Sequence, residues 1–185
     1  MPTRPAKTVL QLRIDLEWMD PPIWRRLLVP AGIRLDKLHD VFQVAMGWTD
    51  SHLHAFTIGQ ARYGVHFDDH PEGELDEKKF TLSRAIGDQR RFRYEYDFGD
   101  DWQHHVVVED THSVPFALSF AVCLDGQRSC PPEDCGGPPG YANLLEAIAD
   151  SAHEEFDEYI EWVGKDFDPE EFNLATTNAA LQRLG

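Results

Sequence analysis

Three cysteines and three of the nine histidines are the residues of this chain whose types and spacing could hold a metal ion. Cys130 and Cys135 are separated by four residues, and Cys123 lies seven positions before Cys130. Structural zinc takes four tetrahedral ligands and favours thiolates and imidazoles, so a histidine from a neighbouring strand would complete the set. The sequence predicts a structural zinc site formed by Cys123, Cys130, Cys135 and His104. The spacing leaves open the alternative that the thiols are packing residues of a loop rich in proline and glycine.

A second candidate site combines histidines with aspartates. His52 and His54, which are also candidates for the fourth zinc ligand, stand two positions apart in a predicted strand and would project from one face. Asp97, Asp100 and Asp101 crowd at a predicted hairpin tip, where carboxylates bind hard cations or exchange protons. The alternative metal set is therefore His52, His54, Asp97 and Asp100, which would serve a metal-dependent hydrolase. The alternatives are a histidine hydrogen-bonded at the edge of the core and aspartates that only form the turn.

The composition limits the classes of function. The chain has 185 residues with 33 acidic and 17 basic side chains, a formal net charge of −16. This charge repels a phosphate backbone, so we expect no direct DNA binding, while docking of a basic protein partner stays open. Nucleotide-binding and hydrolase motifs are absent, so no nucleotide cofactor is expected. There is no membrane-length apolar run and no signal peptide, which predicts a cytoplasmic protein with free thiols.

Strands dominate the first part of the chain. Apolar residues alternate with polar ones over residues 8–18, which predicts a half-buried strand, and an extended pattern resumes over residues 23–29. Apolar residues at helical spacing over 35–46, followed by Gly47, predict a helix with a glycine cap. Further strands are expected at residues 52–58 and 61–65, with a surface loop at 66–79.

The second part of the chain changes from strands to helices. A short helix over residues 81–86 precedes two strands, at 92–98 and 102–109, which form a hairpin with an acidic tip. Residues 123–140 fit neither regular period and are expected to be a structured loop. Helices are predicted at 141–149 and 154–163, and a further helix start at 168–171, with Asp168 as cap. If His104 joins the cysteines, the hairpin tip and the cysteine loop must lie side by side.

These elements predict a single α+β domain over residues 1–185. Its parts are a strand-rich region (8–110), a Cys/Pro/Gly loop (115–140) and a helical region (141–184). We expect a mixed or antiparallel sheet with one packed helix, followed by C-terminal helices.

Several long motifs support a family resemblance. In chain order they are PPIWRRLLVP at 21–30, MGW at 46–48, HLH at 52–54, YEYDFGDDWQH at 94–104, CPPEDCGGPPGY at 130–141 and FDPEEF at 167–172. Together they resemble the plasmid pRiA4b ORF-3-like family, whose members are also named passenger proteins of bacterial insertion elements. The resemblance implies an α/β roll-like bacterial domain, and it implies no specific reaction.

The sequence thus favours an accessory or binding protein over an enzyme. By resemblance the protein is associated with a mobile element, and the metal it would hold is a structural zinc ion. The alternative is a metal-dependent hydrolase that uses the His/Asp site.

Overall fold

Alternating apolar residues build the central strand of the sheet. In β1 (Lys7–Leu16) the side chains of Leu10, Leu12, Ile14 and Leu16 are buried, as the alternation predicted. β1 pairs antiparallel with β2 (Trp24–Pro30) on one side and with β7 (Trp102–Val114) on the other. The prediction that this strand continues to Trp18 was wrong. Trp18 lies beyond the strand in a left-handed conformation, with φ of 62°, and its side chain is exposed.

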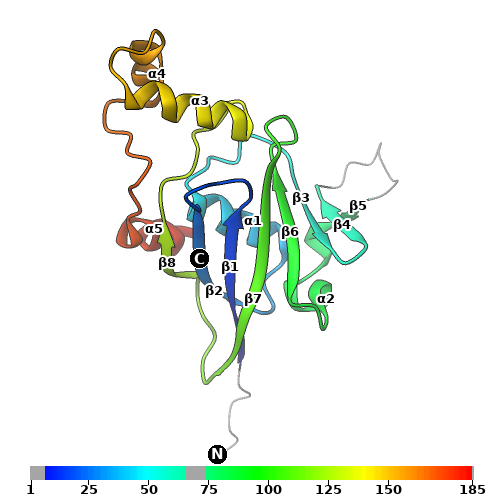
Figure 1. Cartoon of the computed structure of the whole chain (residues 1–185). Coiled ribbons are helices and arrows are strands. Elements are labelled where there is room, and N and C mark those ends of the chain that lie inside the picture. Colours follow the sequence, from blue (N-terminus) through cyan, green and yellow to red (C-terminus); the bar gives the residue numbers. More distant parts are fainter. Residues whose placement is uncertain (1–6, 66–73, 185) are drawn as a thin grey trace, which may run out of the picture.

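The computed structural model describes residues 7–65 and 74–184, and in them one sheet carries all the strands. The strand order is β5-β4-β3-β6-β7-β1-β2-β8 (Figure 1). Neighbouring strands are antiparallel except β4 and β5, which are parallel. The other strands are β3 (His54–Ile58), β4 (Ala61–Gly64), β5 (Glu74–Asp76), β6 (Arg91–Tyr96) and β8 (Val122–Gln127).

The helix α1 (Leu35–Met46) brings both apolar and polar groups to the core. Its apolar stripe is buried, and His39 and Gln43 are buried on the same helix. The helix ends at Gly47, whose φ of 102° is the left-handed cap that the sequence predicted. Because His39 and Gln43 are buried, each needs a hydrogen-bond partner inside the protein.

The remaining helices lie between the strands or after them in the chain. They are α2 (Leu82–Ile86), α3 (Gly137–Ala149), α4 (Phe156–Val163) and α5 (Leu174–Leu181), with short 3-10 turns η1 (Glu77–Lys79) and η2 (Gln182–Leu184). α3 and α4 contact each other at the end of the sheet where the β6–β7 hairpin turns, whereas α5 packs on β8 and α1 (Figure 1).

Three local predictions differ from the structure. Residues 123–140 are not wholly irregular, because β8 supplies the hydrogen-bonding partner for the outer edge of β2. The expected loop at 66–79 contains β5 and η1 in its last six residues, and residues 66–73 lie outside the described residues. Asp168 does not start a helix. It accepts the Glu170 N–H in a turn, and α5 begins after Asn173, whose side chain accepts from Thr176 N.

The predicted fold class is confirmed. The protein is a single α+β domain with a mixed eight-stranded sheet, an early packed helix and helices at the C-terminal end. None of the described helices is both long enough and apolar enough to cross a membrane.

Candidate functional site

The segment between α1 and β3, residues 49–53, is held by side chains from other elements, and we call it the site loop. Three consecutive backbone N–H groups of this loop each donate to a different side chain. The bonds are Thr49 N to Glu133 Oε1 at 2.9 Å, Asp50 N to Gln43 Oε1 at 2.9 Å, and Ser51 N to the Tyr96 hydroxyl at 3.0 Å. The loop is therefore fixed although it has no regular structure, and the histidines and aspartates in and around it have defined positions.

Two histidine rings stack beside the site loop. His39 of α1 and His54 of β3 are buried, and their nearly parallel rings have centroids 3.4 Å apart. Asp50 Oδ1 lies 2.8 Å from His39 Nε2, and Glu77 Oε2 lies 2.7 Å from His54 Nε2. His39, Asp50 and His54 each offer a ligand atom within 4.8 Å of the others. We call His39, Asp50, His54 and Glu77 the histidine-pair group.

A directed chain of hydrogen bonds determines which nitrogen of His39 carries the proton. Gln43 Oε1 accepts the Asp50 N–H, so the Gln43 amide nitrogen faces Tyr94 and donates to its hydroxyl oxygen at 2.9 Å. The Tyr94 hydroxyl lies 2.8 Å from His39 Nδ1. If Nδ1 carried the hydrogen, the buried hydroxyl hydrogen would have no acceptor among the described residues, which is costly. Tyr94 therefore donates to Nδ1, and His39 donates from Nε2 to Asp50.

This chain of bonds closes on Asp50 and needs no metal ion. Burial, together with the neighbouring His54, lowers the pKa of His39, which keeps its ring neutral at pH 7. A metal on His39 Nε2 would displace the hydrogen that Asp50 accepts and force it onto Nδ1. For His39 and Asp50 the geometry is thus that of a closed chain of hydrogen bonds, while His54 is paired separately with Glu77.

The histidine-pair group lines a polar cavity of about 630 Å³. His39, Asp50, His54 and Glu77 contribute to its wall, and so does His52 of the site loop. The Asp50 side chain is 60% exposed, so it is the member of the group that meets solvent. A cavity of this volume is within the range of small-molecule sites.

His52, in the middle of the site loop, faces three carboxylates from two other loops. Its Nε2 lies 3.0 Å from Asp134 Oδ1, 3.6 Å from Asp97 Oδ2 and 3.9 Å from Glu133 Oε2. His52, Asp97 and Asp134 meet the same 4.8 Å criterion as the first group. We call His52, Asp97, Glu133 and Asp134 the loop-junction group, because the site loop, the hairpin tip (residues 97–101) and the cysteine loop (residues 130–136) meet there.

The loop-junction group contains a polar atom without a partner. His52 Nε2 is buried and, within the part of the chain that the structure describes, has no acceptor or donor in hydrogen-bonding geometry, although Asp134 Oδ1 is 3.0 Å away. Unsatisfied buried polar atoms are few in native proteins, and each requires an explanation. One nitrogen that faces three carboxylate oxygens is a donor set that a divalent cation would satisfy. Of the two groups, this one fits a metal ion.

Two carboxylates of the loop-junction group, those of Asp97 and Glu133, are held in place by hydrogen bonds. Asp97 has a left-handed backbone, with φ of 54°, and its Oδ1 accepts from Gly99 N at 2.9 Å, which leaves Oδ2 toward His52. The Tyr96 hydroxyl donates to Glu133 Oε1 at 3.0 Å. Burial raises the pKa of Tyr96, and Glu133 adds to the shift, so the hydroxyl keeps its hydrogen and positions Glu133.

The structure does not gather Cys123, Cys130, Cys135 and His104 into one ligand set. In residues 7–65 and 74–184, the groups of three or more histidine, cysteine or acidic ligand atoms within 4.8 Å are the two above, and neither contains these residues. The Cys123 thiol donates to Asp125 O at 3.4 Å. His104 is fully buried, with Nδ1 3.1 Å from Tyr94 O. Cys123 and His104 thus have hydrogen-bond partners of their own, in different parts of the fold.

The cysteine thiols are also held in their protonated form. Burial raises the pKa of Cys130 to about 11 and that of Cys135 to about 12. The nearby Arg25, which donates to Cys130 Sγ at 3.7 Å, offsets part of this shift for Cys130. Zinc binds the thiolate, so the metal-free environment of these two cysteines disfavours the ligating state.

The alternative set His52, His54, Asp97 and Asp100 is divided by the structure. His52 and Asp97 lie in the loop-junction group and His54 in the histidine-pair group. The reason is that β3 begins at His54, so the alternation that would place His52 and His54 on one face does not apply. Asp100 Oδ2 accepts from Gly136 N at 3.1 Å. The hairpin tip and the cysteine loop therefore lie side by side, joined through Asp100 and Gly136 and not through His104.

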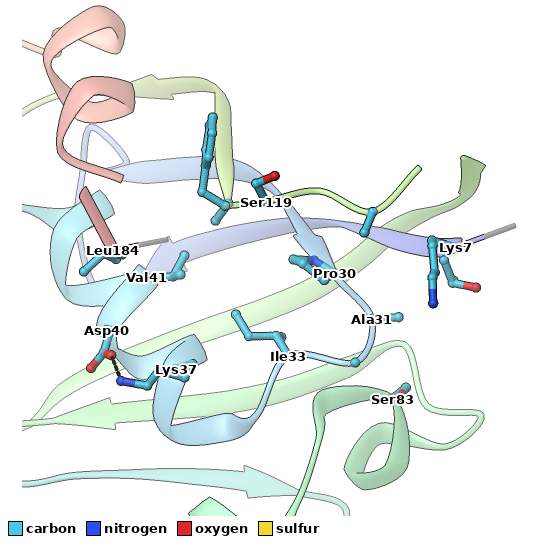
Figure 2. Close-up of a pocket in the computed structure, with 15 residues that line it drawn as sticks. Lys7, Pro30, Ala31, Ile33, Lys37, Asp40, Val41, Ser83, Ser119 and Leu184 are labelled. Carbon is cyan, nitrogen blue, oxygen red and sulfur yellow. Dashed lines mark hydrogen bonds and ion pairs between the residues drawn. The ribbon is translucent and has the colours of Figure 1, made fainter. Parts of the chain in front are cut away.

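A second cavity, of about 760 Å³, is mainly apolar, and its described lining contains no member of either group, although it shares Lys37 and Asp40 with the polar cavity. Figure 2 shows its wall, to which Pro30, Ile33, Val41 and Leu184 contribute. Among its described lining residues Asp40 is the only one with a carboxylate, which pairs with Lys37 at 2.9 Å. The described lining holds no histidine or cysteine, so this cavity lacks the metal-binding and proton-exchanging side chains of the two groups.

Fold and site together define a class of protein. It is a single α+β domain with an eight-stranded sheet, in which one group of histidines and carboxylates lies where three loops meet and a second lies between α1, β3 and η1. Residues 8–176 match the family described as plasmid pRiA4b ORF-3-like protein, and the chain belongs to this family.

Two relatives agree with this assignment over nearly the whole chain. The uncharacterized protein y4hQ of Sinorhizobium fredii (strain NBRC 101917 / NGR234) is 38% identical over 180 residues, which cover 96% of this chain and 92% of the relative. The crystal structure of MM3350, a protein of unknown function from Methanosarcina mazei Go1, has a TM-score of 0.84 and 35% identity. The match covers 91% of this chain and 97% of the MM3350 chain. Both relatives agree with the family and the fold, and neither points to an activity.

Sequence reasoning missed five residues of the two groups. They are His39, Asp50, Glu77, Glu133 and Asp134. One signal was present, because His39 falls on the apolar stripe of its helix, where a polar side chain must find a buried partner. The acidic residues carried no such signal, since they belong to segments rich in acidic and turn-forming residues.

Proposed function

We propose that this protein binds one divalent metal ion at the loop-junction group. The observation that carries the proposal is His52 Nε2, buried without a hydrogen-bond partner and within 4 Å of three carboxylate oxygens. One imidazole and three carboxylates suit Zn²⁺ or Mn²⁺, because imidazole favours zinc and carboxylates favour manganese. The ion would neutralise carboxylates that are gathered without a nearby lysine or arginine among the ion pairs of the described residues.

The ion has a structural role in this proposal. His52, Asp97 and Asp134 belong to three loops far apart in the sequence, so one ion would join the site loop, the hairpin tip and the cysteine loop. The protein would then act as an accessory or binding protein, with its acidic surface available to a basic protein partner. The proposed ion is structural, like the zinc ion predicted from the cysteines, but its ligands are oxygen and nitrogen atoms.

Metal-dependent hydrolysis is a second candidate function. It is favoured by one observation: His52 also lines the polar cavity of about 630 Å³ that His39, His54 and Glu77 border. Asp134 is 72% exposed, so an ion bound there could keep a water molecule as a ligand. Incubating zinc-loaded protein with p-nitrophenyl acetate and p-nitrophenyl phosphate tests this candidate, and activity that survives His52→Ala would exclude the loop-junction group as its source.

The metal proposal is tested by titrating Zn²⁺ into chelator-treated protein that carries no histidine tag. Wild-type protein should bind about one ion per chain, and His52→Ala should lower the affinity by at least about tenfold, since it removes the only nitrogen ligand. The matched control is His112→Ala, a partly exposed histidine on β7 outside both groups. It should bind zinc like the wild type.

Two results would overturn this proposal. Wild-type protein that binds no Zn²⁺ and no Mn²⁺ would show that His52 is simply paired with its carboxylates. Binding that is lost in His54→Ala but kept in His52→Ala would move the ion to the histidine-pair group. Thermal unfolding of each variant separates loss of binding from loss of fold.

A further inference from the structure

A buried chain of side chains leads from the core to the site loop. Gln43 and His39 come from α1 and Tyr94 from β6, and each is at most 3% exposed. Tyr94 lies between the other two, with its hydroxyl 2.9 Å from Gln43 Nε2 and 2.8 Å from His39 Nδ1. Because each bond has only one direction that satisfies every buried atom, the chain of bonds is ordered from Gln43 to His39.

Both ends of this chain hold Asp50. Gln43 Oε1 accepts the Asp50 backbone N–H at 2.9 Å, and His39 Nε2 donates to the Asp50 carboxylate at 2.8 Å. Asp50 has a left-handed backbone, with φ of 56°, a conformation that is unfavourable for residues other than glycine. The two bonds offset that cost and fix the direction in which the chain leaves Asp50 toward His52.

A second tyrosine of β6 holds Ser51, the residue that follows Asp50. Tyr96 follows Tyr94 by two positions in β6, and both are fully buried. The Tyr96 hydroxyl accepts the Ser51 N–H at 3.0 Å and donates to Glu133 at 3.0 Å. Two tyrosines of one strand thus fix two consecutive residues of the site loop, immediately before His52.

We propose that the Gln43–Tyr94–His39 chain is a positioning device that holds the site loop so that His52 faces the carboxylates of the loop-junction group. Among the described residues, no hydrogen bond or ion pair joins Tyr94 or His39 to that group, so their link to it runs through Asp50. The inference rests on the proposed function, because the ligand that His52 is positioned for is the divalent ion. It also assigns His39 a single neutral form, with its hydrogen on Nε2.

The experiment uses two variants that disturb the chain in different ways. Tyr94→Phe removes the donor to His39 Nδ1. Gln43→Glu keeps the acceptor for Asp50 N but attracts the Tyr94 hydroxyl hydrogen away from His39. Tyr63→Phe is the control, since Tyr63 is another core tyrosine and its ring lies outside this chain.

Three quantities are measured in each protein. Nitrogen-15 NMR of the metal-free protein reports the His39 tautomer, amide hydrogen exchange reports the Asp50 N–H, and Zn²⁺ titration reports the metal affinity. In wild type and in the Tyr63 control we expect a hydrogen on His39 Nε2. Gln43→Glu should shift the tautomer, whereas Tyr94→Phe leaves the hydrogen on Nε2, because Asp50 still accepts it there and Nδ1 has no acceptor in this variant. Tyr94→Phe should accelerate Asp50 exchange, and both variants should weaken zinc binding, each effect by about tenfold.

The outcomes separate this inference from the metal proposal. A wild-type His39 that carries its hydrogen on Nδ1, or chain variants that change neither the tautomer nor the Asp50 exchange, would overturn the positioning device. A shifted tautomer with unchanged zinc affinity would also overturn it. Wild-type protein that binds no metal would refute the proposed function, while the tautomer and exchange measurements would still decide whether the chain holds the loop. If Tyr94→Phe does not fold, the tautomer is tested with Gln43→Glu alone, because glutamate has nearly the same side-chain volume as glutamine.

Discussion

Burial of His104 leads to a quantitative prediction about stability in mild acid. The side chain is fully buried, and burial lowers its pKa from 6.5 to about 4. In the unfolded chain the same ring has an ordinary pKa, near 6.5. At pH values between these two pKa values, His104 is protonated in the unfolded state and neutral in the native state. The contribution of His104 to stability is therefore complete above about pH 6.5 and is lost as the pH falls toward 4.

The magnitude follows from the difference between the two pKa values. Each unit of pKa corresponds to about 1.4 kcal/mol, so the shift is worth roughly 3 kcal/mol in all. The loss should reach about 2 kcal/mol near pH 5 and about 3 kcal/mol near pH 4. For a domain of this size, that is a large part of a free energy of unfolding that is typically about 5 to 15 kcal/mol.

The assay is urea unfolding of the wild type and of His104→Asn at several pH values. The asparagine amide can donate to Tyr94 O in place of His104 Nδ1, and it does not titrate in this range. Other groups with shifted pKa, such as His39, are present in both proteins and cancel in the difference. The stability of the wild type relative to the variant should fall by about 2 kcal/mol between about pH 7.5 and pH 5. A difference that stays constant over this range would refute the reasoning, as would an NMR titration that finds His104 protonated near pH 6.

Two further predictions concern buried groups elsewhere in the domain. The Cys130 thiol, with its pKa raised to about 11, should react with iodoacetamide at neutral pH far more slowly in the native protein than in urea; equal rates would contradict its burial. Glu77→Ala should lower the free energy of unfolding by about 3 kcal/mol, because it leaves the buried His54 without its carboxylate, whereas Glu77→Gln, which keeps an acceptor, should cost less. Chemical denaturation compares these variants, and equal costs for the two would argue that only packing is lost.

The alternation in the strands and the spacing of the first helix could be read from the sequence because local physics sets them. Burial of one face requires a period of two in β1, and Gly47 was recognisable as a helix cap because it must adopt a left-handed conformation. Long motifs in chain order were enough to indicate the family. The short strand β8 was missed, because it forms only by pairing with β2, far away in the sequence.

The candidate site could be predicted only in part. His52 and Asp97 were recognised as metal-ligand types, but Asp134 looked like part of a turn and His39 like a residue of a helix. Which carboxylates meet which imidazoles depends on how three loops pack together. No short-range pattern contains that information, since the contacts join residues separated by tens of positions.

The sequence by itself determined the fold class, the family and the supply of histidines and carboxylates. These follow from periodicity, composition and motif order, which are local or additive properties of the chain. Only the tertiary structure decided that the cysteines and His104 form no common ligand set among the described residues, that the His39 and His54 rings stack, and that His52 faces three carboxylates. The physical reason is that a ligand set or a proton position depends on distances and directions of a few ångströms between distant residues, and these are fixed only when the sheet, α1 and the three loops pack against one another.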